Sequence, residues 1–205
     1  MYMRAFSASG DSIFTSILVS AKALNIGLSL SSLTMSTGQR LLIALPSQVV
    51  LPTRANTKTG WYLPELVHPC NDLDGYVELI KLESFLGKFA EYVGIVFVGG
   101  YGPMFDHTVD PTSHALIHGI YMVQGQTVTG FSNAEEDAYE FTDAMPFLLE
   151  DKLKEHGGQY KMTDQLFNVK VVTSGKNENL ITGQNPPSAR VIGKVLLQAI
   201  QKGVV

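Results

Sequence analysis

One stretch limits the folds open to this chain more than any other, the run from Gly94 to Asp106. Ile95 to Val98 is continuously apolar, which is typical of a strand buried on both faces of a parallel sheet. The turn that follows contains, in order, Gly99, Gly100, Tyr101, Gly102 and Pro103. Such a turn has two interpretations. In the first, its backbone N–H groups cradle an oxyanion or a phosphate at the carboxyl edge of an α/β sheet. In the second, it is a tight strand-to-helix turn without a ligand.

Composition narrows the class of protein. The chain has 205 residues, of which 45% are hydrophobic and 17% charged, an ordinary globular balance for one domain. The net charge of −4 gives no indication of a nucleic-acid or anionic-membrane partner. Cys70 is the single cysteine, so an intrachain disulfide is excluded and a reducing compartment is expected. No window of about 20 residues is apolar enough to span a bilayer.

Strand and helix signals alternate from residue 39 onward. Apolar runs bounded by proline or glycine predict strands at Arg40–Pro46, Tyr76–Ile80, Ile95–Val98, Gln126–Gly130, Val169–Thr173 and Leu180–Gly183. Helical spacing and capping signals predict helices at Gly60–Pro69, Ser84–Tyr92, Asp110–Met122, Ser132–His156 (split at Pro146) and Pro187–Gln201. This alternation predicts an α/β protein with a mainly parallel sheet.

The first 37 residues differ from the rest, being rich in Ser, Leu, Ile and Ala with three charged residues, Arg4, Asp11 and Lys22. A mitochondrial presequence would be basic and poor in acids, which fits weakly, and a secretory signal is interrupted by Lys22 and Asn25. The third alternative is that the natural protein starts at Met35. We therefore expect residues 1–37 to be a disordered or non-native extension, residues 1–34 to carry no part of the core, and residues 38–205 to form the domain.

Five motifs in this part of the chain occur together in a known order. They are Lys58–Trp61, Glu65–Pro69, Gly99–Asp106, Val128–Glu136 and Ile181–Pro186. From Met35 to the C-terminus the sequence resembles the ThiJ/PfpI family of the class I glutamine-amidotransferase-like superfamily. Its most similar branch is the chaperone-like, stress-response branch that includes glutathione-independent glyoxalases (glyoxalase III, or D-lactate dehydratases). The resemblance implies a flavodoxin-like sheet sandwiched by helices, and a cytoplasmic lyase that converts methylglyoxal to D-lactate without a cofactor.

The resemblance also implies roles for individual residues. A family cysteine attacks the aldehyde carbon as a thiolate, and a histidine moves protons on the hemithioacetal. Glu65 matches the carboxyl beside this nucleophile, whereas its sequence neighbours alone also allow an exposed carboxylate. Glu136 matches the third member of the Cys–His–Glu set. The turn residues Gly99, Gly100, Tyr101 and Gly102 match the oxyanion turn.

The departures from the family are as informative as the matches. No Cys-His-Gly-Pro motif occurs in the chain, and Met122 is followed at once by the residues leading to the strand at 126–130. The fold is therefore expected to lack the central nucleophile strand, either through skipped exons or through a real deletion. A second family segment is missing between Leu79 and Lys81. Tyr101 and Gln48 stand where histidine is usual.

These departures leave rival functions open. The leading interpretation is a glyoxalase III-type homologue that is inactive as written, and the alternative is a non-catalytic chaperone-like or regulatory protein. A nucleotide-binding module is disfavoured, because the glycines do not follow Gly-x-Gly-x-x-Gly. Cys70 lacks any sign of activation, and His114 with His118 has only helical spacing to suggest zinc, so no metal is expected. The expected partners are a small 2-oxoaldehyde and, from the family alone, a second copy of the chain. A mitochondrial location follows only if the extension is a presequence.

Overall fold

The computed structural model describes residues 18–20, 40–45, 48, 50–54, 57–59, 65–68, 73, 77–78, 92–111 and 123–203. Its strands are β1 (Leu18–Ser20), β2 (Arg40–Ala44), β3 (Val77–Glu78), β4 (Tyr92–Phe97), β5 (Thr127–Val128), β6 (Gln159–Tyr160), β7 (Val171–Ser174) and β8 (Leu180–Gly183). Its helices are α2 (Gly102–Phe105), α4 (Asn133–Ala138), α5 (Leu149–Glu155) and α6 (Ala189–Lys202), with short 3₁₀ turns at η4 (Thr142–Ala144), η5 (Lys176–Glu178) and η6 (Pro186–Ser188). Residues 65–68 are also helical.

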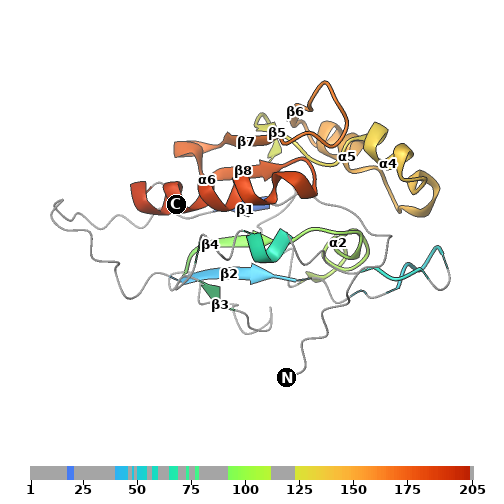
Figure 1. Cartoon of the computed structure of the whole chain (residues 1–205), viewed down its shortest axis with the longest axis horizontal. Helices are drawn as coiled ribbons and strands as arrows, with labels where there is room; N and C mark the ends of the chain where they lie inside the picture. The colour runs from blue at the N-terminus through green and yellow to red at the C-terminus, as the bar shows by residue number, and fades with distance from the viewer. Residues whose placement is uncertain are drawn as a thin grey trace, which may run out of the picture.

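Among these residues, six strands form one sheet in the order β3-β2-β4-β1-β8-β7. β2 runs parallel to both β3 and β4, but β1 is antiparallel to β4 and to β8, and β7 is antiparallel to β8. The expectation of a mainly parallel sheet is therefore wrong in detail, since the sheet is mixed. Figure 1 shows the parallel pair β2 and β4 side by side, with β8 and β7 beyond β1.

The antiparallel pairs have two physical origins. β7 and β8 are joined by a short connection through Gly175 and η5, and a short connection permits only antiparallel pairing. Gly175 supports this turn with a φ of 80°, a conformation that glycine adopts without strain. This strand pair was predicted across Gly175 and is confirmed. β1 comes from the N-terminal segment, where no strand was expected.

β1 changes the interpretation of that segment. Leu18–Ser20 lies between β4 and β8, in the middle of the sheet. These three residues therefore do contribute to the sheet, contrary to the expectation for residues 1–34. The remainder of residues 1–37, like most of the predicted helices Ser84–Tyr92 and Asp110–Met122, lies outside the described residues. The division into an extension and a domain from residue 38 stays a prediction.

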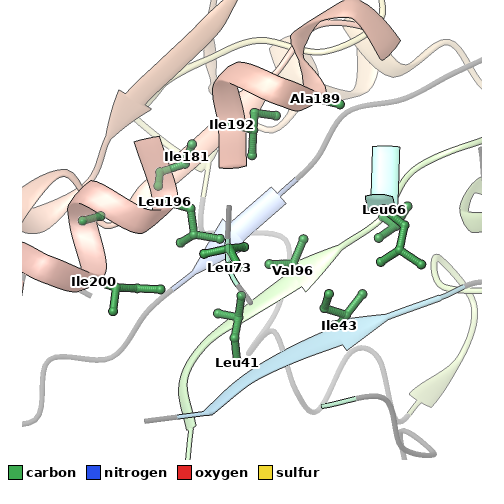
Figure 2. Close-up of a cluster of buried hydrophobic side chains, with 12 residues drawn as sticks. Leu41, Ile43, Leu66, Leu73, Val96, Ile181, Ala189, Ile192, Leu196 and Ile200 are labelled. Carbon is green, nitrogen blue, oxygen red and sulfur yellow. The ribbon is translucent and has the colours of Figure 1, made fainter. Parts of the chain in front are cut away.

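The main core lies between the sheet and α6. Side chains of β2, β4 and β8 meet those of α6 in one cluster, which Figure 2 shows with Leu41, Ile43, Val96, Ile181, Ile192, Leu196 and Ile200 labelled. The apolar residues of α6 recur at i, i+4 and i+8, and they are almost completely buried. Each contributes roughly 1.5–3 kcal/mol to stability by leaving water. α6 thus holds β8 and its carboxyl end in place.

The segment after β5 was predicted well because its signals are local. Ser132 caps α4 with a complete capping box, in which its side chain accepts from the Glu135 N–H and Glu135 reaches back to the Ser132 backbone. Pro146 separates α4 and η4 from α5, as expected. The Thr129 N–H donates to the Thr182 hydroxyl at 3.0 Å, which ties this segment to β8. α4 is thereby positioned beside the carboxyl end of β8.

Candidate functional site

The glycine turn directly follows β4. Val98 continues the pairing with β2, since its N–H donates to the Ala44 carbonyl at 3.1 Å. Gly100 then has a φ of 116°, a region that residues with a Cβ rarely adopt, so glycine is required there. Gly99 and Gly102 are buried beside it, and α2 begins at Gly102 with proline in its first turn. The predicted strand-to-helix turn is confirmed.

Tyr101 points from this turn into an aromatic cluster rather than into solvent. Its side chain is 3% exposed, and its ring stacks on Phe141 at 4.7 Å between centroids. The Arg54 guanidinium lies over the Phe141 ring, 4.7 Å from its centre. Leu51, Phe131 and the residues around η4 complete this cluster. The tyrosine ring is therefore fixed in one place by packing.

The Tyr101 hydroxyl and the Glu136 carboxyl on α4 lie close enough to shift each other's pKa. Burial raises the pKa of Glu136 from 4.5 to about 7, while the nearby Tyr101 hydroxyl works in the opposite direction and favours the charged form. Burial and the neighbouring Glu136 both raise the pKa of Tyr101, so the phenol stays protonated. Near neutral pH Tyr101 keeps its own proton, and the Glu136 carboxyl can accept or release a second one. Such a carboxyl is suited to general acid–base chemistry.

The position of Glu65 excludes one of its two interpretations. Its side chain is 1% exposed, so it is not a solvated surface carboxylate. The next residue, Leu66, joins the main core with Val98, and Figure 2 shows Leu66 near the carboxyl end of β4. Glu65 therefore belongs to the segment that packs at this edge of the sheet. That it faces the glycine turn stays a prediction.

Glu135, which the sequence assigned only to a helix cap, accepts hydrogen bonds from several segments of the described chain. Its carboxylate is fully buried and accepts from Ser132 N and Oγ at 3.0 Å, Phe167 N at 2.9 Å, Gln184 Nε2 at 2.9 Å and Asn185 Nδ2 at 2.8 Å. These donors come from three separate segments. Glu135 thus fixes the start of α4, and with it the adjacent Glu136, to the turn after β8. The presence of both motifs in the sequence, Ser132–Glu136 and Gln184–Asn185, was the signal that could have identified it.

An open hollow of about 350 Å³ lies beside Arg54. It is lined by Arg54, Asp137, Glu140, Thr142 and Asp143. Arg54 also lies over the Phe141 ring, and its charge lowers the pKa of Tyr101 against the larger effect of burial. The excess of carboxylates on the wall disfavours an anionic ligand.

The remaining candidates are not brought together by the structure. Cys70, His114 and His118 lie outside the described residues, and no group of three metal-ligating side chains occurs among those that are described. Gln48 is near the turn's far end, because its N–H donates to Asp106 Oδ2 at 3.1 Å. His107, next to Asp106, is mostly buried against Phe97, and burial lowers its pKa. Within the described part of the chain, no helix is long and apolar enough to cross a membrane.

Comparison with solved structures identifies the fold. The chain is similar to Rapid Encystment Protein 24 kDa from Francisella tularensis, with a TM-score of 0.65, 24% sequence identity and coverage of 78% of this chain and 98% of that one. It is also similar to glyoxalase III from Candida albicans, with a TM-score of 0.62, 15% identity and coverage of 80% and 98%. No protein-family model and no curated protein matches the sequence. The chain therefore has the mixed α/β fold of ThiJ/PfpI-like structures, also called DJ-1/PfpI-like.

Proposed function

We propose that this chain derives from a glutathione-independent glyoxalase, a lyase that converts methylglyoxal and water to D-lactate. The observation that carries the proposal is the buried carboxyl of Glu136, whose pKa is raised to about 7 and which lies near Tyr101 of the glycine turn. The fold in which this carboxyl occurs is similar to that of glyoxalase III. Glu136 takes the role of the acid of the Cys–His–Glu set. Glu65 takes the role of the carboxyl beside the nucleophile, for which its burial is suitable.

The residues present support part of the reaction. In the family reaction, a thiolate adds to the aldehyde carbon, the carbonyl oxygen becomes an oxyanion, and a proton then moves from the first carbon to the second before water releases lactate. Backbone N–H groups of Gly99–Gly102 are proposed to hold the oxyanion. Glu136 is proposed to orient the histidine that moves the proton. The substrate is a neutral, polar 2-oxoaldehyde, no cofactor is needed, and the cytoplasm is the proposed compartment.

The nucleophile is what this chain lacks. No Cys-His-Gly-Pro motif occurs in the sequence, and neither Glu65 nor Glu136 can replace a thiolate. Losing one member of a catalytic triad typically costs several powers of ten in rate. The 205-residue chain is therefore proposed to be inactive, and the missing residues belong between Met122 and Val123. The absence of the motif equally favours the second candidate, a non-catalytic chaperone-like or regulatory protein. A homodimer is proposed for either candidate.

The test compares two chains. The chain as written is expected to form no D-lactate from methylglyoxal above the buffer rate. A chain carrying a Cys-His-Gly-Pro strand and turn between Met122 and Val123 is expected to form it, and changing the inserted cysteine to alanine is expected to abolish it. Sequencing the transcript across this junction separates the two candidates. A transcript that encodes the segment supports the enzyme, and one that lacks it supports the chaperone-like protein.

A further inference from the structure

The place of β1 in the sheet is unusual for so short a strand. Leu18–Ser20 pairs on both sides, with Leu18 opposite Phe97 and Thr182, and Ser20 opposite Ile95 and Leu180. A strand paired on both sides lies in the interior of a sheet, where an empty position would expose N–H and C=O groups of both neighbours. The flanking strands β4 and β8 bring Val96 and Ile181 to the main core. The N-terminal segment therefore closes an opening in the middle of the sheet.

The direction of β1 distinguishes it from the strands around it. β4 is parallel to β2, and because β1 is antiparallel to both β4 and β8, these two flanking strands point the same way. The start of β1, at Leu18, therefore lies at the edge where β4 runs into the glycine turn and β8 into Gln184. A strand-to-helix turn at this edge needs a strand that ends there. β1 begins there instead, so it completes the sheet without offering a place for a nucleophile.

We infer that the position between β4 and β8 is a strand-binding site, occupied by the chain's own Leu18–Ser20 in place of a parallel strand. The occupant is three residues long and joins the sheet through its backbone. A parallel strand inserted after Met122 and β1 exclude each other, because both need the same N–H and C=O groups of β4 and β8. This second statement rests on the proposed function, whereas the occupancy by β1 does not.

Disulfide trapping in the full-length chain tests the occupancy. In a Cys70→Ser background, Val19→Cys is combined with Val96→Cys or with Ile181→Cys, its register partners on the two sides. Directly opposite residues have Cα atoms about 4.5–5.5 Å apart, within reach of a disulfide. The matched control combines Val19→Cys with Ile43→Cys. Ile43 pairs with Val96 from the far side and so lies two strand spacings from β1, roughly 9–10 Å.

The expected result is an intrachain disulfide in both test pairs, identified by peptide mass spectrometry, and none in the control. Failure of both test pairs, or an equal yield in the control, overturns the inference. Mixing isotopically labelled and unlabelled chains before oxidation checks the source of the strand. Disulfides within one chain support it, and mixed pairs mean that a second copy fills the site and overturn it.

Two backbone variants give an independent check on the same chain. Val19→Pro removes an N–H that a strand paired on both sides needs, and is expected to lower the urea midpoint of unfolding. Val19→Thr keeps the N–H and the preference for a strand, so it is expected to unfold close to the parent. Equal midpoints for the proline and threonine variants overturn the inference.

The mutual exclusion of β1 and the inserted strand is measured in the chain that carries the strand inserted after Met122. There the yield of the Val19–Val96 disulfide is expected to fall several-fold, because the new strand takes the position of β1. An unchanged yield overturns the exclusion. The two proposals fail separately, since D-lactate formation depends on the inserted cysteine and trapping in the parent chain depends only on β1.

Discussion

Replacing Glu135 with glutamine tests how the site is held together. The carboxylate accepts five hydrogen bonds, two on Oε1 from Phe167 N and Asn185 Nδ2, and three on Oε2 from Ser132 and Gln184. A glutamine side chain has one carbonyl oxygen. In the more favourable of its two orientations, this oxygen takes the place of Oε2 and accepts from the three donors of Ser132 and Gln184. Its NH₂ group then faces the other two donors. Each unsatisfied buried donor costs roughly 1–3 kcal/mol, so Glu135→Gln is expected to destabilise the protein by about 2–6 kcal/mol.

Urea unfolding followed by circular dichroism measures this loss as a lower midpoint with an unchanged slope. Glu155→Gln is the matched control, because Glu155 is solvent-exposed and its ion pair with Lys152 lies on the surface, so its loss is expected to leave the urea midpoint close to that of the parent. Removing one orphaned donor with Asn185→Ala in the Glu135→Gln background is expected to cost less than the two single changes added together. A loss below about 1 kcal/mol in Glu135→Gln would refute the account of this network.

Three further predictions concern the turn and its neighbours. Because burial raises the pKa of Glu136 from 4.5 to about 7, the folded chain holds a proton that the unfolded chain releases in this range, so stability falls by roughly 3 kcal/mol as the pH rises from about 4.5 to 7. Glu136→Gln is expected to remove most of this slope in urea midpoints measured across that range, and a slope as steep as the parent's would contradict it. Tyr101→Phe removes a hydroxyl that favours the charged carboxyl, so the pKa of Glu136 is expected to rise further in a carboxyl NMR titration, and an unchanged or lower pKa would contradict the pairing. Gly183→Ala places a Cβ 2.2 Å from Ile192 Cδ1 in the core and is expected to cost about 1–3 kcal/mol in thermal or urea unfolding, which an unchanged melting temperature would contradict.

The parts of the fold that sequence predicted are those with local signals. The capping box at Ser132, the break at Pro146 and the hairpin across Gly175 each depend on residues a few positions apart, and all three are confirmed. The glycine turn after β4 was found for the same reason, since a buried strand, glycine and proline follow one another. The start of the last helix was predicted to within two residues of Ala189.

The parts that were missed depend on contacts across the chain. β1 lies in a segment that was expected to be an extension outside the domain, and its pairing with Phe97 and Thr182 is visible only when the sheet is assembled. Glu135 was assigned to a cap, but its other donors come from residues 32 to 50 positions later, at Phe167, Gln184 and Asn185. The mixed sheet follows from β1 and β7 together. The alternation of helices and strands from residue 39 onward indicated the fold class. It could not show the direction of β1, because β1 precedes the alternating elements.

The central claim is that the acid–base half of a glyoxalase site survives here without its nucleophile. D-lactate formation from methylglyoxal by the purified 205-residue chain tests it most directly, measured by a stereospecific enzymatic assay beside a buffer blank. The account predicts a rate indistinguishable from the blank, and a measurable rate once a Cys-His-Gly-Pro segment is placed after Met122. Turnover by the chain as written, lost on changing Cys70 to serine, would contradict the account and assign the nucleophile to Cys70.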